Sequence, residues 1–178
     1  MSHYGFGFGI GQVKKAGSVS YDADAQAFFT ATGITDTTQK SAVNQLVLDL
    51  KSYNIWTKMK AIYPMVGGTS TTHKYNLVNP VDSNAAYRLS FSTGWTHSST
   101  GALPNGSAYA NPFLTPSAVL TANNTHLSVY IGTDTVAGNK VEMGVGVGGT
   151  LVPIMMLMKF CFQRKNLVHL YLKRLIDL

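Results

Sequence analysis

The chain has 178 residues, of which 12% are charged and 45% are hydrophobic. This length allows one domain with a sizeable core, or one sheet domain with a small helical piece, and it excludes two large domains. The charged share is about half that of an ordinary globular protein. Ser, Thr, Asn and Gly replace the missing charges, a composition more typical of particle-surface and extracellular β-domains than of cytosolic enzymes.

The net charge of +6 is concentrated at the C-terminal end. After residue 150, five cations and Asp177 give +4, which leaves +2 for the first 150 residues. No basic stripe beside stacking aromatics occurs before residue 150, so we expect no nucleic-acid partner. Cys161 is the single cysteine of the chain, which excludes an intramolecular disulfide and a Cys-based zinc site.

Residues 1–19 are predicted to form an extended arm. Glycine alternates with large apolar residues over residues 4–11, and a period of two suits an extended segment. An arm docked on a neighbour would cover these apolar side chains, whereas a flexible tail would expose them. The pattern favours the docked arm and leaves the tail open. The opening residues lack a basic region followed by an apolar stretch, which argues against a secretory signal.

Residues 20–54 are predicted to form a helical hairpin. Ser20 or Asp22 can cap a first helix, and Gly33 can end it in the left-handed conformation. A second helix has a capping-box-like start at Asp36, after which apolar residues recur at i, i+3, i+4 and i+7. The apolar stripe of the hairpin must pack on another element, most simply the sheet that follows.

Residues 55–149 are predicted to form a β-sandwich. Short apolar or alternating runs are separated by strong turn signals, and this spacing predicts an antiparallel sandwich or jelly roll rather than a parallel sheet with crossover helices. The predicted strands are residues 60–65, 73–77, 86–91, 95–97, 109–114, 127–131 and 141–147.

Residues 150–178 change in character, because no glycine follows Thr150 and Leu, Met, Lys and Arg dominate. The apolar run over residues 151–162 is interrupted by Pro153 and Lys159, and it falls short of the roughly 20 residues that span a bilayer. We therefore expect no transmembrane segment. Whether this basic apolar tail forms a strand or an amphipathic helix, and whether it packs on the domain or faces a partner, stays open.

Six segments together resemble a module of tailed-bacteriophage virion structural proteins that is described as laminin-G-like or concanavalin-like. The resemblance covers somewhat over half of the chain, and its segments are specific in combination rather than singly. They are DADAQAF (22–28), TDTTQK (35–40), WTKMKAIYP (56–64), VGGT (66–69), HKYNL (73–77) and GWTHSSTGALPNG (94–106).

The resemblance implies a helical hairpin followed by a jelly-roll sandwich on a virion protein that decorates the particle or contacts the host. In that family the sandwich continues further, whereas residues 151–178 lack the expected later strands. One interpretation is a frameshifted or truncated reading of a longer gene, which would leave an incomplete sandwich with unpaired sheet edges. Such edges would favour pairing with another subunit.

The segment over residues 94–112 is the predicted glycan-binding surface. Aromatic rings can cover the apolar faces of sugars, while amide and hydroxyl groups bond to ring hydroxyls. The predicted binding residues are Trp95, His97, Asn105 and Tyr109. The alternative, in which Trp95 is a core residue and the loop is merely polar, stays open.

A glycan-degrading hydrolase of the concanavalin-like fold is the main alternative. It would need two carboxylates at the scissile bond, whereas the chain has one glutamate, Glu142. Asp82 and Asp134 lie beside turn residues, where Asp is common for backbone hydrogen bonding. The histidines of the sheet region lack the close spacing of metal ligands: His73, His97 and His126. We predict no catalytic residue, no metal and no cofactor.

The sequence as a whole predicts an α+β, mostly β, non-catalytic component of a phage virion appendage, such as a decoration, fibre or tail protein. The expected location is the particle surface. The expected partners are other virion proteins, host-surface polysaccharide and further copies of the chain. A third interpretation, a membrane- or nucleic-acid-associating protein with a basic tail, rests on residues 150–178.

Overall fold

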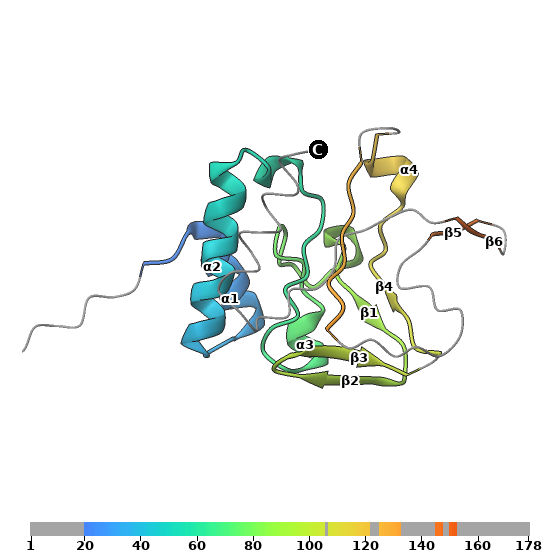
Figure 1. Cartoon of the computed structure of the whole chain (residues 1–178), viewed down its shortest axis with the longest axis horizontal. Helices are drawn as coiled ribbons and strands as arrows, with labels where there is room; N and C mark the ends of the chain where they lie inside the picture. Colours follow the sequence, from blue (N-terminus) through green and yellow to red (C-terminus); the bar gives the residue numbers. More distant parts are fainter. Residues whose placement is uncertain (1–19, 106, 122–124, 133–144, 148–149, 153–178) are drawn as a thin grey trace, which may run out of the picture.

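A computed structural model describes residues 20–105, 107–121, 125–132, 145–147 and 150–152 (Figure 1). The N-terminal arm and nearly all of the basic tail lie outside the described residues, and so do the predictions made for them. The described chain combines a pair of helices at one end with short antiparallel strands at the other. This mixed architecture confirms the coarse prediction of an α+β fold. The predicted excess of strand over helix is not seen in the described part.

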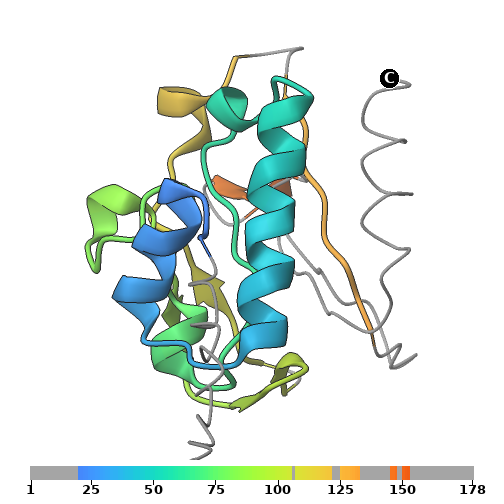
Figure 2. The ribbon, with the colours of Figure 1, turned by 90° about the vertical axis from the view of Figure 1, so that its left-hand side faces the viewer.

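The helical hairpin forms where the sequence predicts it. Helix α1, Ala23–Thr32, begins at Asp22, whose side chain accepts a hydrogen bond from the backbone N of Asp24 at 3.0 Å. It ends at Gly33, which has a φ of 68° and so adopts the left-handed conformation that glycine tolerates. Helix α2, Thr37–Ser52, begins at Asp36 and ends at Tyr53. Figure 2 shows the two helices side by side in front of the other described elements.

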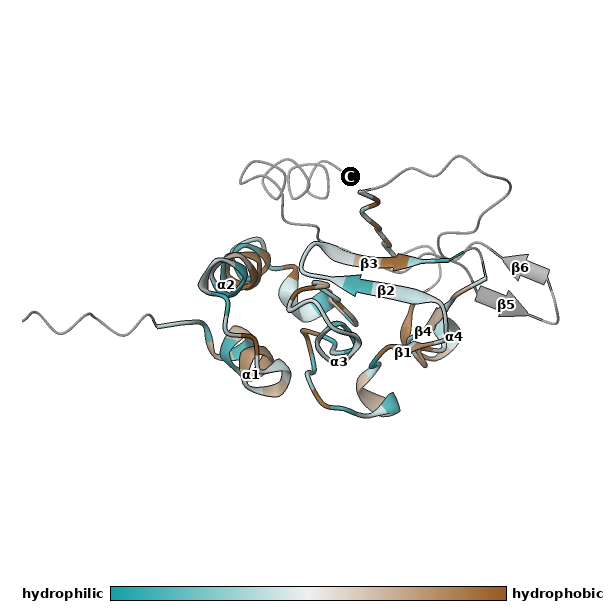
Figure 3. Ribbon diagram, turned by 90° about the horizontal axis from the view of Figure 1, so that it is seen from below, coloured by the Kyte–Doolittle hydropathy of each residue, from teal (hydrophilic) through white to brown (hydrophobic). Residues whose placement is uncertain are grey.

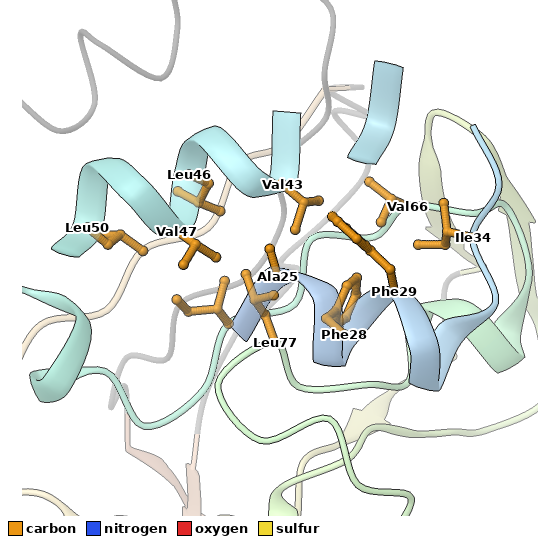
Figure 4. Close-up of a cluster of buried hydrophobic side chains, with 11 residues drawn as sticks. Ala25, Phe28, Phe29, Ile34, Val43, Leu46, Val47, Leu50, Val66 and Leu77 are labelled. Carbon is orange, nitrogen blue, oxygen red and sulfur yellow. The ribbon is translucent and has the colours of Figure 1, made fainter. Parts of the chain in front are cut away.

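A first hydrophobic core lies between the hairpin and the segments that follow it (Figure 4). The apolar stripe of the hairpin packs on Ile62, Val66 and Leu77, which are not part of any strand. The expected partner, a sheet, is therefore replaced by irregular buried segments. The hairpin contributes these residues: Ala25, Phe28, Phe29, Ile34, Val43, Leu46, Val47 and Leu50.

The prediction of a strand over residues 60–65 is wrong, although the segment is buried. Pro64 has no N–H to donate, and Met65 has a φ of 52°, outside the range of a strand. The side chain of Asn76 replaces the missing ladder. It accepts from the backbone N of Ile62 at 2.9 Å and donates to the backbone O of Lys60 at 3.2 Å.

The prediction of a strand over residues 73–77 is also wrong, because a short helix ends at His73 and residues 74–77 form no strand. Helix α3, Ser70–His73, starts with a capping box in which Thr69 and Thr72 bond each other's backbone N–H through their hydroxyls, both at 3.1 Å. A preceding 3-10 turn, η1, spans Trp56–Lys58. Inside the predicted strand, the backbone N of His73 donates to the backbone O of Thr69 at 2.9 Å, and the backbone N of Lys74 donates to the backbone O of Ser70 at 3.2 Å. Both N–H groups are therefore used within the helix instead of in strand pairing.

Two antiparallel strand pairs form one bent hairpin. Strand β1, Ser90–Phe91, pairs with β4, Ala110–Asn111, and between them β2, Trp95–Ser98, pairs with β3, Gly101–Pro104. The pairs are therefore nested, like the inner and outer parts of a folded hairpin. The sequence predicts β2 and β4 at their places and misses β3. Figure 3 shows β2 beside α3.

Several predicted strands are shorter than expected or absent. In residues 86–91 a 3-10 turn, η2, Asn84–Ala86, is followed by Tyr87 with a φ of 58°, so the strand begins only at Ser90. Helix α4, Pro116–Val119, follows β4. Residues 127–131 form no strand. Of residues 141–147, the described part holds β5, Val145–Val147, which pairs with β6, Thr150–Val152.

A second, smaller core lies beneath the bent hairpin. Its buried residues are Ala61, Tyr63, Met65, Leu89 and Ala102. The Tyr63 hydroxyl donates a hydrogen bond to the backbone O of Tyr87, and burial raises the pKa of Tyr63. None of the helices in the described residues has the length and apolar character that crossing a membrane requires.

Candidate functional site

Two of the predicted binding residues, Trp95 and His97, lie on the same face of β2. They are half-buried, whereas their neighbour Thr96 is exposed, as the two-residue period of a strand requires. The two rings stand side by side with centroids 6.3 Å apart and planes within 25°. Phe91 on β1 packs edge-on against both, at 5.3 Å from Trp95 and 4.7 Å from His97. This face of β2 therefore joins the two strand pairs.

His97 contacts a second histidine that lies far from it in the sequence. Its Nδ1 lies 2.9 Å from Nδ1 of His73, which ends α3 and is 1% exposed. In such a pair one ring must carry its proton on Nδ1 and donate, while the other accepts. Burial lowers the pKa of His97 below its ordinary value of 6.5, which favours the neutral ring that can accept.

Asn105 closes the bent hairpin at its kink. Its backbone N donates to the backbone O of Gly94 at 2.8 Å. Its Oδ1 accepts from the backbone N of Ser107 at 3.2 Å, from the Ser107 hydroxyl at 3.3 Å and from the backbone N of Ala108 at 3.0 Å. The side-chain oxygen is therefore used to build the turn. Its Nδ2 has no hydrogen-bond acceptor among the described residues and lies against Gly94, 2.3 Å from where a Cβ on that glycine would stand.

Tyr109 combines an engaged backbone with an exposed ring. Its backbone O accepts from the backbone N of Ser92 at 2.9 Å and from the indole Nε1 of Trp95 at 3.1 Å. Its backbone N donates to the Ser92 hydroxyl at 2.9 Å. The side chain itself is 67% exposed. The backbone thus fixes the position from which the phenol ring projects.

Three of the four predicted residues therefore surround the kink of the hairpin, and we call Trp95, Asn105 and Tyr109 the kink surface. The fourth, His97, is adjacent to Trp95 but bonds to His73 and packs on Phe91. Sequence reasoning missed the His73 contact, because the two histidines are 24 residues apart and no local pattern links them. Trp95 fits both interpretations of the sequence, as a binding residue and as a core residue. It packs against the second core but is only half-buried.

Of the residues weighed for catalysis or metal binding, His73 and His97 meet, but no third such residue joins them where the structure describes the chain. Asp82 is paired with Lys74 at 2.6 Å and with Arg88 at 3.4 Å, and these cations, chiefly Lys74, lower the pKa of its carboxyl group. His126 is exposed. Asp134 and Glu142 lie outside the described residues. Within the described ranges, no three His, Cys, Asp or Glu side chains are grouped so that they could hold a metal ion.

Comparisons of the chain with protein-family models, with curated proteins and with solved structures returned no match.

Proposed function

We propose that the protein is a non-catalytic structural module at the surface of a bacteriophage particle, where it assembles as a homo-oligomer with other virion proteins and contacts host-surface glycans. One observation carries the glycan part of the proposal. Residues 89–133, which include all four strands of the bent hairpin, contain no Asp, Glu, Lys or Arg. A surface built from this segment offers hydroxyl, amide and aromatic groups instead of ionised ones.

The kink surface has the chemistry that sugar binding needs. The exposed ring of Tyr109 and the accessible part of Trp95 can cover the apolar C–H face of a pyranose. The Nδ2 group of Asn105 can donate to ring hydroxyls. Exposed hydroxyl side chains lie in the same hairpin: Thr93, Thr96, Ser98, Ser99 and Ser107.

Hydrolysis is supported less well than binding. A glycosidase needs one carboxylic acid with a raised pKa that stays protonated until it donates to the leaving oxygen. The two cations beside Asp82 act in the opposite direction, because they stabilise its ionised form. Asp82 is therefore suited to an ion pair that braces the segment between α3 and β1.

The finer fold proposal is an antiparallel jelly roll. A jelly roll is a long hairpin whose nested strand pairs fold over into two facing layers. The β1–β4 pair around the β2–β3 pair, bent at Gly94 and Asn105, has this nesting. The proposal is that the bent hairpin is the inner part of such a roll.

Tyr109→Ala tests the glycan contact, with Tyr53→Ala as the matched control. Both tyrosines are exposed, at 67% and 42%, but Tyr53 lies at the end of α2. On a glycan array with the full chain, we expect binding that Tyr109→Ala loses and Tyr53→Ala keeps. An array without any bound glycan, or equal loss in both variants, would overturn the glycan contact. A fall in polymer viscosity on incubation would overturn the non-catalytic assignment.

The virion location has a separate test. Antibodies raised against the full chain should label intact particles of the phage that encodes it. Absence of the chain from purified particles, measured by mass spectrometry, would contradict this part of the proposal without bearing on glycan binding.

A further inference from the structure

We infer that the ligand of the kink surface is an uncharged polysaccharide rather than an acidic or phosphorylated one. This inference rests on the proposed function and specifies its ligand class. It follows from where the charged side chains of the described residues lie relative to the hairpin. Two groups of charges approach the hairpin, and each meets it at a point remote from the kink.

The first group consists of Lys74, Asp82 and Arg88. It lies beyond the end of the β1–β4 pair that is farther from the kink. In this register Ser90 faces Asn111 and Phe91 faces Ala110. Counting outward in one direction places Ser92 opposite Tyr109, in agreement with their two hydrogen bonds.

Counting in the other direction places Arg88 opposite Phe113, and the Arg88 guanidinium lies 5.9 Å from the Phe113 ring. Arg88 and Ser92 are four residues apart, which is about 13 Å along a strand. Arg88 is also paired with Asp82, which in turn binds Lys74. Asp82 thus offsets one of the two positive charges of this group, which keeps a net charge of +1.

The second group lies at the opposite end of the β2–β3 pair. Helix α2 reaches the hairpin through Gln39, whose Nε2 donates to the backbone O of Ser99 at 3.3 Å. Ser99 follows β2 and is four residues from Trp95, again about 13 Å. The nearby cation Lys40 is directed toward α1, since its Nζ lies 5.2 Å from the rings of both Tyr21 and Phe29.

The charged ends of both groups are also engaged elsewhere, Arg88 at the ring of Phe113 and Lys40 at the rings of Tyr21 and Phe29. Recognition of a uronate or a phosphate is strongest with Arg or Lys donors in direct contact. Among the described residues, no hydrogen bond, ion pair or cation–π contact joins a Lys or Arg side chain to Trp95, Asn105 or Tyr109. The rings of Trp95 and Tyr109 and the amide of Asn105 instead match neutral hydroxyls and C–H faces. Contacts of this neutral kind are individually weak, and repeated copies of the protein would add avidity.

The test compares the full chain on gels that contain a neutral polymer, dextran, mannan or galactan, with gels that contain alginate or polygalacturonate. We expect at least one neutral polymer to retard migration equally at roughly 0.02 and 0.5 M NaCl, because no counterions are released. The variant Tyr109→Ala should weaken that retardation roughly tenfold, as loss of a central aromatic contact does. The control Tyr53→Ala should leave it unchanged.

The outcomes separate the two levels of the proposal. Salt-sensitive retardation by the acidic polymers alone, lost in Tyr109→Ala, would overturn the neutral class and leave glycan binding in place. Failure of every polymer, together with an empty glycan array, would overturn glycan binding itself. Retardation by acidic polymers that both tyrosine variants retain would place the binding elsewhere on the chain and also contradict the inference.

Discussion

The imidazole rings of His73 and His97 meet through their Nδ1 atoms at 2.9 Å, and this contact joins helix α3 to strand β2. Their ring centroids are 5.0 Å apart, so the two rings approach nearly tip to tip. The hydrogen bond between them requires that one of the two Nδ1 atoms carries no proton and accepts. When both rings are protonated, each Nδ1 becomes a donor and the two cations repel each other.

We therefore expect stability to fall as the pH is lowered through about 6.5. Burial lowers the pKa of His97 in the folded protein below its ordinary value of 6.5, so between these two pKa values the unfolded chain binds more protons. Stability contributed by neutral His97 is complete above pH 6.5, declines below it and levels off once the folded pKa is passed. Urea unfolding at pH 7.5, 6.5 and 5.5 measures this change.

His97→Gln should flatten that pH dependence, because the amide can still bond to His73 but does not titrate. His126→Gln is the matched control, since the side chain of His126 is exposed. If His97→Gln keeps the full pH dependence of the wild type, the histidine pair is not its source.

Asn76 is expected to be one of the most sensitive positions for stability. It is fully buried, and its amide makes four hydrogen bonds, with the backbone N of Ile62 and Val78 and the backbone O of Lys60 and Ala86. Asn76→Leu removes all four and leaves their backbone partners buried, at a cost of at least about 3 kcal/mol. Denaturant unfolding against Asn79→Ala, at an exposed site, checks this. A loss under about 1 kcal/mol would show that water replaces the amide.

The helix ends could be predicted from the sequence because their chemistry is local. Asp22, Gly33 and Asp36 act on backbone groups within a few residues of themselves, so their residue types alone indicate the structure. The amphipathic spacing of α2 likewise identified its buried face, which holds Val43, Leu46, Val47 and Leu50.

The strands were harder to predict, because the backbone groups of an apolar segment can be satisfied by other hydrogen bonds than strand pairing. Residues 73–77 have an apolar pattern, but the helix that begins at the capping box of Thr69 and Thr72 extends to His73 and uses the backbone N–H groups of His73 and Lys74. Residues 60–65 are apolar, yet their partner is the side chain of Asn76. The residues of the kink surface could be named from the aromatic and amide residue types in residues 94–112. Its arrangement depends on the bend at Gly94, which only the pairing register reveals.

Gly94→Ala should destabilise the protein more than Gly33→Ala does. Both glycines have positive φ, 101° and 68°, so an added Cβ is strained at either site, by about 1–2 kcal/mol. At Gly33 the new atom meets nothing within 4 Å, whereas at Gly94 it would lie 2.3 Å from Nδ2 of Asn105. Asn105 would have to move and give up the three bonds that its Oδ1 accepts.

We therefore expect Gly94→Ala to cost roughly 3 kcal/mol in total, and also to reduce the proposed glycan binding. Thermal unfolding of the two variants, with retardation on a neutral polymer, measures both effects. Equal destabilisation of the two variants would contradict the role given to Asn105.

Gln39 is expected to couple the helical hairpin to the strand region. Its side chain does not complete a capping box with Asp36; Oε1 accepts from the backbone N of Gly67 at 2.8 Å, and Nε2 donates to the backbone O of Ser99 at 3.3 Å. Gln39→Ala removes both bonds and should cost about 1 kcal/mol or slightly more. Gln45→Ala, on the same helix, loses one exposed bond to Asp49 and should cost about 0.5 kcal/mol or less.

Because both variants replace Gln by Ala in α2, helix propensity cancels in the comparison. Amide hydrogen exchange gives the more specific readout. Faster exchange at Gly67 in Gln39→Ala, with unchanged rates in Gln45→Ala, is the expected result, because the Gly67 N–H loses its acceptor. Unchanged exchange at Gly67 in both variants would mean that α2 and the turn at residues 67–68 are held together by the first core, through Val66, rather than by Gln39.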